Sequence, residues 1–576
     1  MLRGLSAGPN PSHPERGTGA DHARVPEAHR FWTKCAVYAA IFIALFAWFF
    51  LTSSRGVYIY DEGLELTAAM RVAAGQVIHR DFYYNYGPAM VYLLAGLFKV
   101  FGQSVLIERL LWTADIAAGG VGIFILARRL AAASRFGVSK FRPATWATAA
   151  LLLSVLWGES LGLKTLFTVW STWLLLPVFT CTLRRRRALA AGIVTGVATL
   201  FRYDTGAGLA AVQVLIIALA CWLAQPDARR RMRATGSALW PYLLGFAIPV
   251  APLFIAYAAV GAIHDFLYDI VLYPAKYYHA ARNLPFPRIH RQNFQDSVVY
   301  ILPVLIAFGL YAALRWYLPQ RREDRRRIPE WVGATLAFAA VGTVMYLKGL
   351  VRIGAGQLFM ALSPCILLAL VLWMHRGIFA TVERALLAFV LLLFAVAGIF
   401  PTLHDLQNEH RQRSSMLAWI LDPAGQNPRP PFDAWCREHN VVSKGFCFFP
   451  DNDHIQAIEY IDQHTRPGDT LYVGLPQHAR ININDNFTYF ATQRLPATKW
   501  SHFDPFLQNR ADTQQEMIGE LEKNRPPYVV LDSEFEDDRE PNGSSVNTGV
   551  HLLDDYIRQH YGFADRFGEM TILKRK

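Results

Sequence analysis

Blocks of consecutive apolar residues, each close to the length needed to cross a membrane, constrain the fold of this chain more than any other feature. Hydrophobic residues make up 53% of the 576 residues, and short basic gaps separate the blocks. A helix needs about 20 apolar residues to cross a hydrocarbon core of about 30 Å. The blocks therefore predict a polytopic α-helical membrane protein with about 11 transmembrane helices. The predicted spans are 32–52, 105–127, 143–157, 165–183, 188–201, 206–223, 239–260, 298–318, 331–347, 355–374 and 384–403.

The apolar block at 88–102 is ambiguous, because its 15 residues include Lys99 and are few for a crossing. The distribution of charge decides its interpretation. If this block does not cross, every Arg-rich gap falls on the side of the N-terminus, as the positive-inside rule requires. We therefore expect the block to lie along the outer face, with the N-terminus cytoplasmic, the C-terminus extracytoplasmic and the chain in the plasma (inner) membrane. The basic gaps are 128–142, 184–187, 225–233, 315–327 and 375–384.

The same pattern divides the chain into three parts. Residues 1–31 are rich in Pro, Gly, His and Arg, which predicts a disordered cytoplasmic tail. Residues 32–403 form the transmembrane part, with a first outer loop at 53–104. In residues 404–576 strand-like and helix-like runs alternate, and this alternation predicts a small extracytoplasmic α/β domain. Its expected strands are 470–474, 528–532 and 570–574, and its expected helices are 452–464, 513–524 and 550–561.

Composition and motifs exclude several classes of function. The net charge is +12, but the Arg clusters lie between apolar blocks and indicate topology rather than nucleic-acid binding. The chain has no Walker A, HExxH or G-x-S-x-G motif, and no Cys/His spacing typical of zinc or iron–sulfur sites. We therefore expect no nucleic acid partner and no cofactor. Cys436 and Cys447 lie in the polar C-terminal part, where an extracytoplasmic location would permit a disulfide.

The stretch Tyr58–Gly87 carries the candidate catalytic residues. A polar, aromatic-rich segment of this length is more often functional than a simple connection. The candidate catalytic acids in it are Asp61, Glu62 and Asp81, and a carboxylate near a bound sugar can accept a proton from an attacking hydroxyl. Two alternatives remain open. Asp61 and Glu62 could be solvated acids or a cap for a helix at 63–74, and Arg80 could form a local ion pair with Asp81.

Basic and aromatic residues also gather at the outer ends of the predicted helices. Lys and Arg there run against the positive-inside bias, and they suit a lipid phosphate. Structural alternatives are an interfacial role for Arg109, mutual neutralisation of Arg202 and Asp204, and an aromatic belt at 273–282. The candidate substrate- and phosphate-binding residues are Arg80, Tyr86, Arg109, Arg202, Asp204, Tyr273, Lys276, Arg282, Lys348 and Arg352.

The arrangement of residues 58–130 resembles the GT-C superfamily of polytopic glycosyltransferases. The features that carry the resemblance are the Asp61-Glu62 pair, the run from Gly75 to Arg80-Asp81-Phe82, and Gly87-Pro88 opening an amphipathic helix before Arg109. The nearest relatives by motif are the protein O-mannosyltransferases and the lipid A aminoarabinose transferases. This chain has Tyr86-Gly87-Pro88 where the mannosyltransferases usually carry His-Pro-Pro or Lys-Pro-Pro.

The resemblance implies an enzyme in which Asp61 is the base. The donor would be a polyprenyl-phosphate-linked sugar, the reaction would invert the anomeric centre, and the acceptor would be a lipid, glycan or protein hydroxyl at the outer face of the membrane. Membrane lipids are the other expected partners. A divalent metal at Asp61, Glu62 and Asp81 is not favoured, because the cluster is sparse. The alternatives are a transporter or flippase of lipid-linked sugars without catalysis, and a scaffold whose outer domain binds a cell-wall partner.

Overall fold

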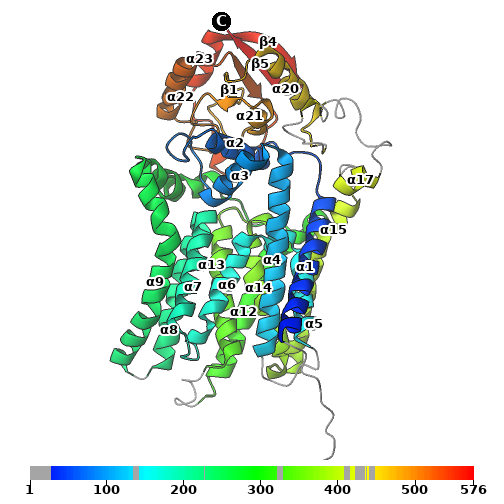
Figure 1. Cartoon of the computed structure of the whole chain (residues 1–576), viewed down its shortest axis with the longest axis vertical. Helices are drawn as coiled ribbons and strands as arrows, with labels where there is room; N and C mark the ends of the chain where they lie inside the picture. Colours follow the sequence, from blue (N-terminus) through cyan, green and yellow to red (C-terminus); the bar gives the residue numbers. More distant parts are fainter. Residues whose placement is uncertain are drawn as a thin grey trace, which may run out of the picture.

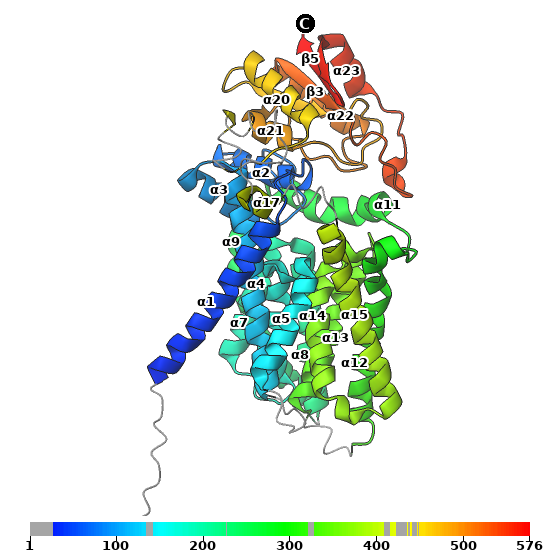
Figure 2. The same cartoon turned by 90° about the vertical axis from the view of Figure 1, so that its right-hand side faces the viewer.

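The computed structural model describes residues 27–133, 142–225, 227–320, 328–407, 415–421, 435, 438–439, 446 and 448–576. The described residues form two parts, a bundle of long helices and a smaller α/β domain at one end of it (Figure 1). The chain enters the bundle at the end that lies away from the α/β domain (Figure 2). The fold class is therefore the one that the apolar blocks predict.

The helices of the bundle coincide with the predicted spans. Seven of the described helices are long and apolar enough to cross a membrane. Three shorter helices of the bundle, Pro143–Leu156, Leu163–Leu175 and Phe359–Met374, are also apolar. The total of eleven crossings stays a prediction, because several of these helices have fewer than 18 residues. The bundle consists of α1 (Glu27–Thr52), α4 (Val105–Ala133), α5 (Pro143–Leu156), α6 (Leu163–Leu175), α7 (Arg185–Phe201), α8 (Tyr203–Ala224), α9 (Ala228–Ala259), α12 (Val298–Tyr317), α13 (Glu330–Gly349), α14 (Phe359–Met374) and α15 (Thr381–Gln407).

Two short helices of the first outer loop lie between the bundle and the α/β domain (Figure 1). They are α2 (Asp61–Ala73) and α3 (Pro88–Phe101). Pro88 occupies the first position of α3, where its missing N–H costs no helical hydrogen bond. The ring of Phe98 stacks on Phe490 of the α/β domain, with 5.8 Å between centroids. The structure thus places the ambiguous apolar block beside the α/β domain, and its location at the outer face stays a prediction.

The segment 261–297, between α9 and α12, is largely helical. It contains π-helical turns, which are rare and often occur at functional sites. Its elements are α10 (Ile263–Leu267), the π-helices η3 (Tyr268–Leu272) and η4 (Pro274–Tyr278), α11 (His279–Arg282) and the 3-10 helix η5 (Arg291–Ser297). Figure 2 shows α11 lying under the α/β domain.

The α/β domain is built on a five-stranded sheet in the order β2-β1-β3-β5-β4. Strand β1 is parallel to β2 and β3, whereas β5 is antiparallel to β3 and β4. The predicted strands and helices are all present, and β2, β4 and α21 are additional. The strands are β1 (Thr470–Gly474), β2 (Leu495–Pro496), β3 (Tyr528–Asp532), β4 (Tyr561–Phe567) and β5 (Met570–Arg575), and the helices are α20 (Asn452–His464), α21 (Phe487–Thr492), α22 (Ala511–Asn524) and α23 (Leu552–His560).

The predicted tail lies partly, and the predicted disulfide wholly, outside the described residues. Helix α1 begins at Glu27, so the last residues of the predicted tail 1–31 are helical. Residues 1–26 lie outside the described residues. Cys436 and Cys447 do so as well, and their pairing stays a prediction.

Candidate active site

The α/β domain holds the start of α2. The backbone N–H groups of Asn486 and Phe487 donate to the carbonyl oxygen of Ile59 at 3.1 and 3.0 Å. The hydroxyl of Thr67 donates to the carbonyl oxygen of Asn486 at 2.8 Å. Gly63 permits this approach, because a Cβ atom there would lie 2.5 Å from the backbone nitrogen of Phe487. The position of Asp61, the first residue of α2, is thus fixed from the far end of the sequence.

Adjacent carboxylates at the start of α2 have different surroundings. Glu62 is paired with Arg109, whose Nη2 lies 2.7 Å from Oε2 of Glu62. Arg109 also donates to the carbonyl oxygens of Ser54 and Gly56 at 3.0 and 3.1 Å. The Glu62–Arg109 pair therefore ties the chain after α1 to the first turns of α2 and α4, which is a structural role.

Asp61 is exposed, and its carboxylate forms no hydrogen bond or ion pair within the described part of the chain. Burial by the surrounding protein nevertheless raises the pKa of Asp61 above its ordinary value. Three guanidinium groups oppose this rise, those of Arg352, Arg282 and Arg202. Asp61 is thus a solvent-accessible carboxylate whose ionised form is favoured by several guanidinium groups.

Glu65 lies one turn after Asp61 and was not among the predicted site residues. The pKa of Glu65 is raised above its ordinary value, mainly because the side chain is buried. The positive charge of Lys164, at the start of α6, opposes this rise. The ammonium group of Lys164 makes no ion pair with the acids of the described residues. The i, i+4 spacing from Asp61 could have revealed Glu65, and the position of Lys164 at an outer helix end could have revealed the lysine.

Arg202, Asp204 and Lys348 form one cluster where α7 ends, α8 begins and α13 ends. Oδ2 of Asp204 lies 3.1 Å from Nζ of Lys348, and Oδ1 lies 3.3 Å from Nε of Arg202. The guanidinium of Arg202 lies 5.6 Å from the ring centre of Tyr86. Gly87 allows this, since a Cβ atom there would lie 2.4 Å from a backbone oxygen of α7. The single carboxylate of Asp204 pairs with two cations, Arg202 and Lys348, so the cluster has a net positive charge.

A buried ion pair connects Arg282 to Asp504. The side chains are 5% and 2% exposed, and Nη2 of Arg282 lies 2.9 Å from Oδ1 of Asp504. Oδ2 of Asp504 accepts hydrogen bonds from Tyr83 at 2.8 Å and Asn85 at 2.7 Å. Arg282 also donates to the side chain and backbone of Asn482. The donors of Arg282 therefore join α11 to the α/β domain, and Asp504 joins that domain to the first outer loop.

An aromatic cluster surrounds His502, a residue of the α/β domain that sequence patterns did not single out. The ring of Tyr86 is parallel to that of His502, with centroids 6.2 Å apart and an angle of 10°. Tyr83 lies at 5.2 Å, and the Tyr60 hydroxyl lies 3.4 Å from Nε2 of His502. Burial lowers the pKa of His502, which favours the neutral imidazole. This cluster joins the first outer loop to the α/β domain.

Three other predicted site residues have contacts of different kinds. Arg352 pairs with Glu540 of the α/β domain. The hydroxyl of the buried Tyr273 donates to the carbonyl oxygen of Pro505 at 2.8 Å, so its role is in packing. Lys276 is exposed, with Nζ 4.9 Å from the ring centre of Tyr277.

Arg80 and Asp81 form the local ion pair that was one of the alternatives. Nη2 of Arg80 lies 2.7 Å from Oδ2 of Asp81, and that oxygen also accepts from the backbone N–H of Val77 at 2.7 Å. The hydrogen bond from Arg80 is the main cause of the lowered pKa of Asp81. Arg71 donates to the Asp81 carbonyl oxygen at 3.0 Å. These contacts fix the turn at 77–81, and a carboxylate with a lowered pKa is a weaker base.

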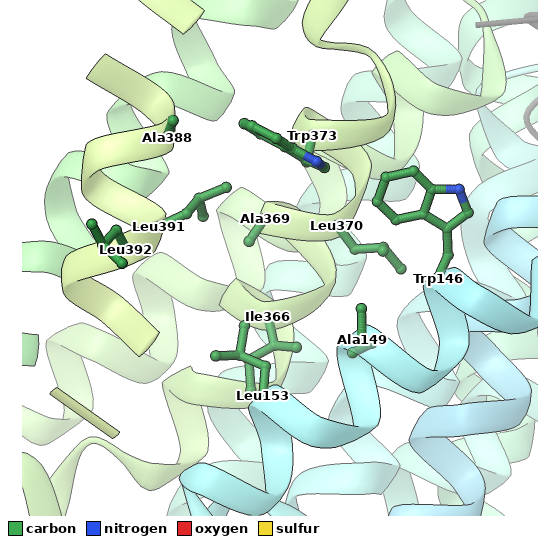
Figure 3. A pocket seen from close by; sticks show the side chains of 11 residues that line it. Trp146, Ala149, Leu153, Ile366, Ala369, Leu370, Trp373, Ala388, Leu391 and Leu392 are labelled. Atoms are coloured by element: carbon green, nitrogen blue, oxygen red, sulfur yellow. The ribbon is translucent and has the colours of Figure 1, made fainter. Parts of the chain in front are cut away.

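Two cavities lie elsewhere in the molecule. An apolar cavity of about 360 Å³ lies between α5, α14 and α15, and Trp146 and Trp373 are among the residues that line it (Figure 3). No titratable side chain lines it, so it offers no groups for acid–base chemistry. A polar cavity of about 280 Å³ lies between the π-helical segment and the α/β domain, where Asp269 contacts His79 and faces Lys499 and Arg510. Asp61 lines neither cavity.

Comparisons with known proteins give likenesses to solved structures. No family model and no curated protein matches the chain. The structure is similar to ArnT from Cupriavidus metallidurans in the apo state, with 14% sequence identity and a TM-score of 0.47 over 95% of this chain and 98% of that one. The structure of the same protein bound to undecaprenyl phosphate is also similar, with 12% sequence identity and a TM-score of 0.43 over 94% of this chain and 98% of that one.

A third similar structure is that of arabinofuranosyltransferase AftD from mycobacteria, with 15% identity and a TM-score of 0.41. The match covers 95% of this chain and 41% of AftD. All three TM-scores are below 0.5. These likenesses therefore do not assign a function to the chain.

Proposed function

We propose that the protein is a membrane glycosyltransferase of the GT-C type. It moves a sugar from a polyprenyl-phosphate carrier to an acceptor hydroxyl at the outer face of the plasma membrane, and Asp61 is the general base. The observation that carries this proposal is the contrast at the start of α2, where Glu62 is paired and the exposed Asp61 is not. A carboxylate whose pKa is shifted by burial and by nearby cations is a candidate functional residue.

The proposed reaction is a single displacement. The acceptor hydroxyl gives its proton to the carboxylate of Asp61 while its oxygen attacks the anomeric carbon. The bond between that carbon and the phosphate oxygen breaks, and the electron pair leaves with the polyprenyl phosphate. Attack opposite the leaving group inverts the anomeric centre. A raised pKa makes Asp61 a stronger base than an ordinary aspartate.

Cations near Asp61 would stabilise the charge that develops on the leaving phosphate. Arg202 and Lys348 share the single carboxylate of Asp204, which leaves donors for a phosphate. Preorganised donors of this kind lower the barrier because they need little rearrangement as charge develops. Lys164 and Arg352 are further candidates for holding the donor phosphate.

The proposed location follows from the distribution of charge. The α/β domain and the first outer loop lie at one end of the bundle, and α9 starts with basic residues at the other end (Figure 1). By the positive-inside rule the basic end faces the cytoplasm. The site then lies outside the cytoplasm, in the inner membrane of the cell.

A carrier-release assay tests the proposal. Purified full-length protein in lipid nanodiscs is incubated with a labelled polyprenyl-phosphate sugar and a membrane extract as the source of acceptor. The proposal expects free polyprenyl phosphate and a labelled acceptor to appear together. Transport of the intact sugar-linked carrier across sealed vesicles, without release of polyprenyl phosphate, would instead identify a flippase.

A further inference from the structure

Three buried side chains of the α/β domain point unpaired polar atoms at one another, far along the chain from Asp61. They are His454 of α20, Asp485 just before α21, and Asp532 at the end of β3, and each is at most 1% exposed. Nε2 of His454 lies 3.6 Å from Oδ2 of Asp532 and 3.9 Å from Oδ2 of Asp485. None of these three atoms has a hydrogen-bond partner. Buried polar atoms are rarely left without a partner, so this convergence requires an explanation.

The opposite atom of each side chain is held in place. Nδ1 of His454 lies 2.7 Å from Oδ2 of Asp451. Oδ1 of Asp485 accepts from the backbone N–H of Thr488 at 3.1 Å, and Oδ1 of Asp532 accepts from that of Glu534 at 2.9 Å. An imidazole oriented by a carboxylate through one nitrogen, with the other nitrogen free, is the usual arrangement of a histidine that ligates a metal.

We propose that a divalent cation binds between Nε2 of His454 and one carboxylate oxygen each of Asp485 and Asp532. The three candidate ligand atoms all lie within 4.8 Å of one another. An imidazolium at His454 would be too far from both carboxylates for good hydrogen bonds, since donor–acceptor distances for N–H···O are about 2.7–3.2 Å. A divalent ion instead offsets both buried negative charges, which are costly when they are not compensated.

The ligand set and its access indicate the kind of ion. Asp451 and Glu534 are exposed and form a second group with His454, so carboxylates line the way from solvent to the buried ligands. One imidazole nitrogen combined with carboxylate oxygens favours Zn²⁺ or Mn²⁺ over Mg²⁺ and Ca²⁺, which prefer oxygen ligands alone. The proposal does not depend on the proposed transferase activity.

The ion would have a structural role that extends to the first outer loop. It would connect α20, the segment before α21 and the central strand β3. Asp485 directly precedes Asn486 and Phe487, whose N–H groups hold the carbonyl oxygen of Ile59 at the start of α2. Loss of the ion is therefore expected to loosen the domain core and its contact with α2.

A second buried histidine–aspartate pair in the same domain provides a matched control. Nδ1 of His478 lies 2.6 Å from Oδ1 of Asp554, and Nε2 of His478 lies 2.7 Å from the hydroxyl of Tyr472. Both ring nitrogens of His478 thus have partners. His478 resembles His454 in burial and in its carboxylate contact, and it has no free nitrogen for a metal.

The test is metal analysis of the full-length protein, purified in detergent without chelators. We expect about one equivalent of Zn²⁺ or Mn²⁺ per chain by mass spectrometry, loss of this ion with EDTA together with a lower melting temperature, and recovery on adding back Zn²⁺ or Mn²⁺. The Asp451→Asn variant keeps the ligands and should bind the ion about 10–100-fold more weakly. The Asp554→Asn variant should keep the wild-type affinity.

Two results would overturn the proposal. The first is a protein that contains no stoichiometric ion, binds neither Zn²⁺ nor Mn²⁺ on titration, and melts at the same temperature with and without EDTA. The second is wild-type metal affinity in both Asp451→Asn and Asp532→Asn, which would place any ion elsewhere. Because the EDTA experiment uses the wild-type chain, the test does not depend on a variant that folds poorly.

Discussion

Nη2 of Arg109 lies 2.7 Å from Oε2 of Glu62, while the neighbouring Asp61 makes no such contact within the described residues. Two adjacent acids that look alike in the sequence therefore have different roles. Glu62 holds the backbone of the first outer loop through Arg109, and the side chain of Asp61 is exposed. Most of the expected behaviour of variants follows from this division.

Replacing Glu62 with Gln should lower stability. The substitution leaves the guanidinium of Arg109 without its charged partner, in a pair whose side chains are only 17% and 10% exposed. We expect a loss of about 1–3 kcal/mol. Thermal unfolding of the full chain in detergent measures it, with Asp555→Asn as a control, since Asp555 pairs with Arg558 at the exposed surface. Equal melting temperatures for the two variants would contradict the structural role of Glu62.

Replacing Asp504 with Asn should destabilise the protein more strongly. Arg282 would then remain buried without a compensating charge, and breaking a buried ion pair in this way costs about 3–5 kcal/mol. The hydroxyl of Tyr83 would also lose the charge on its acceptor. Denaturation of Asp504→Asn should be compared with that of Asp512→Asn, whose carboxylate is 63% exposed. A change of less than about 1 kcal/mol in Asp504→Asn would show that the pair does not hold the domain to the loop.

The activity should fall as the pH is lowered through the pKa of Asp61. The base acts in its ionised form, and burial raises the pKa of this group, so protonation begins at a higher pH than for an ordinary aspartate. The acid limb of kcat/KM should therefore lie above the range of an unperturbed aspartate. A pH profile of sugar transfer measures this limb. A rate that stays constant down into the ordinary aspartate range would argue against a raised pKa at the base.

Cysteine labelling should place the first outer loop and the basic loops on opposite sides of the membrane. In a cysteine-free background, a cysteine in place of the exposed Tyr58 should react with an impermeant maleimide added outside the cell. A cysteine in place of Arg230, in the basic stretch at the start of α9, should react only after permeabilisation. Labelling of the Tyr58→Cys variant from the cytoplasmic side alone would exclude a site at the outer face.

The helices and several site residues were predictable from local patterns. Apolar blocks locate membrane-spanning helices because hydrocarbon cannot satisfy backbone hydrogen bonds. Short alternating runs located the strands β1, β3 and β5. The polar stretch 58–87 pointed to Asp61, and charge at predicted helix ends pointed to Arg202, Asp204 and Lys348, three residues that the structure brings together. These inferences need only the local pattern of apolar residues and the positions of charged residues along the chain.

The remainder depends on contacts between distant segments. His502 and Asp504 reach the site from more than 400 residues after Tyr83 and Tyr86, and no local pattern links these parts of the chain. The π-helical turns at 268–278 differ from α-helix in hydrogen-bond register, which composition does not reveal. The strand β4 carries Asp565 and Arg566, so it lacks the apolar alternation of its neighbours.

The most direct test of the account is the rate of polyprenyl phosphate release by the Asp61→Asn variant beside the wild type and the Asp555→Asn control. Asparagine keeps the size of the side chain and removes the base. The account predicts a rate about 10²–10⁴-fold below the wild type, an unchanged melting temperature and a control with wild-type activity. Wild-type release by a folded Asp61→Asn variant would contradict the assignment of Asp61 as the base.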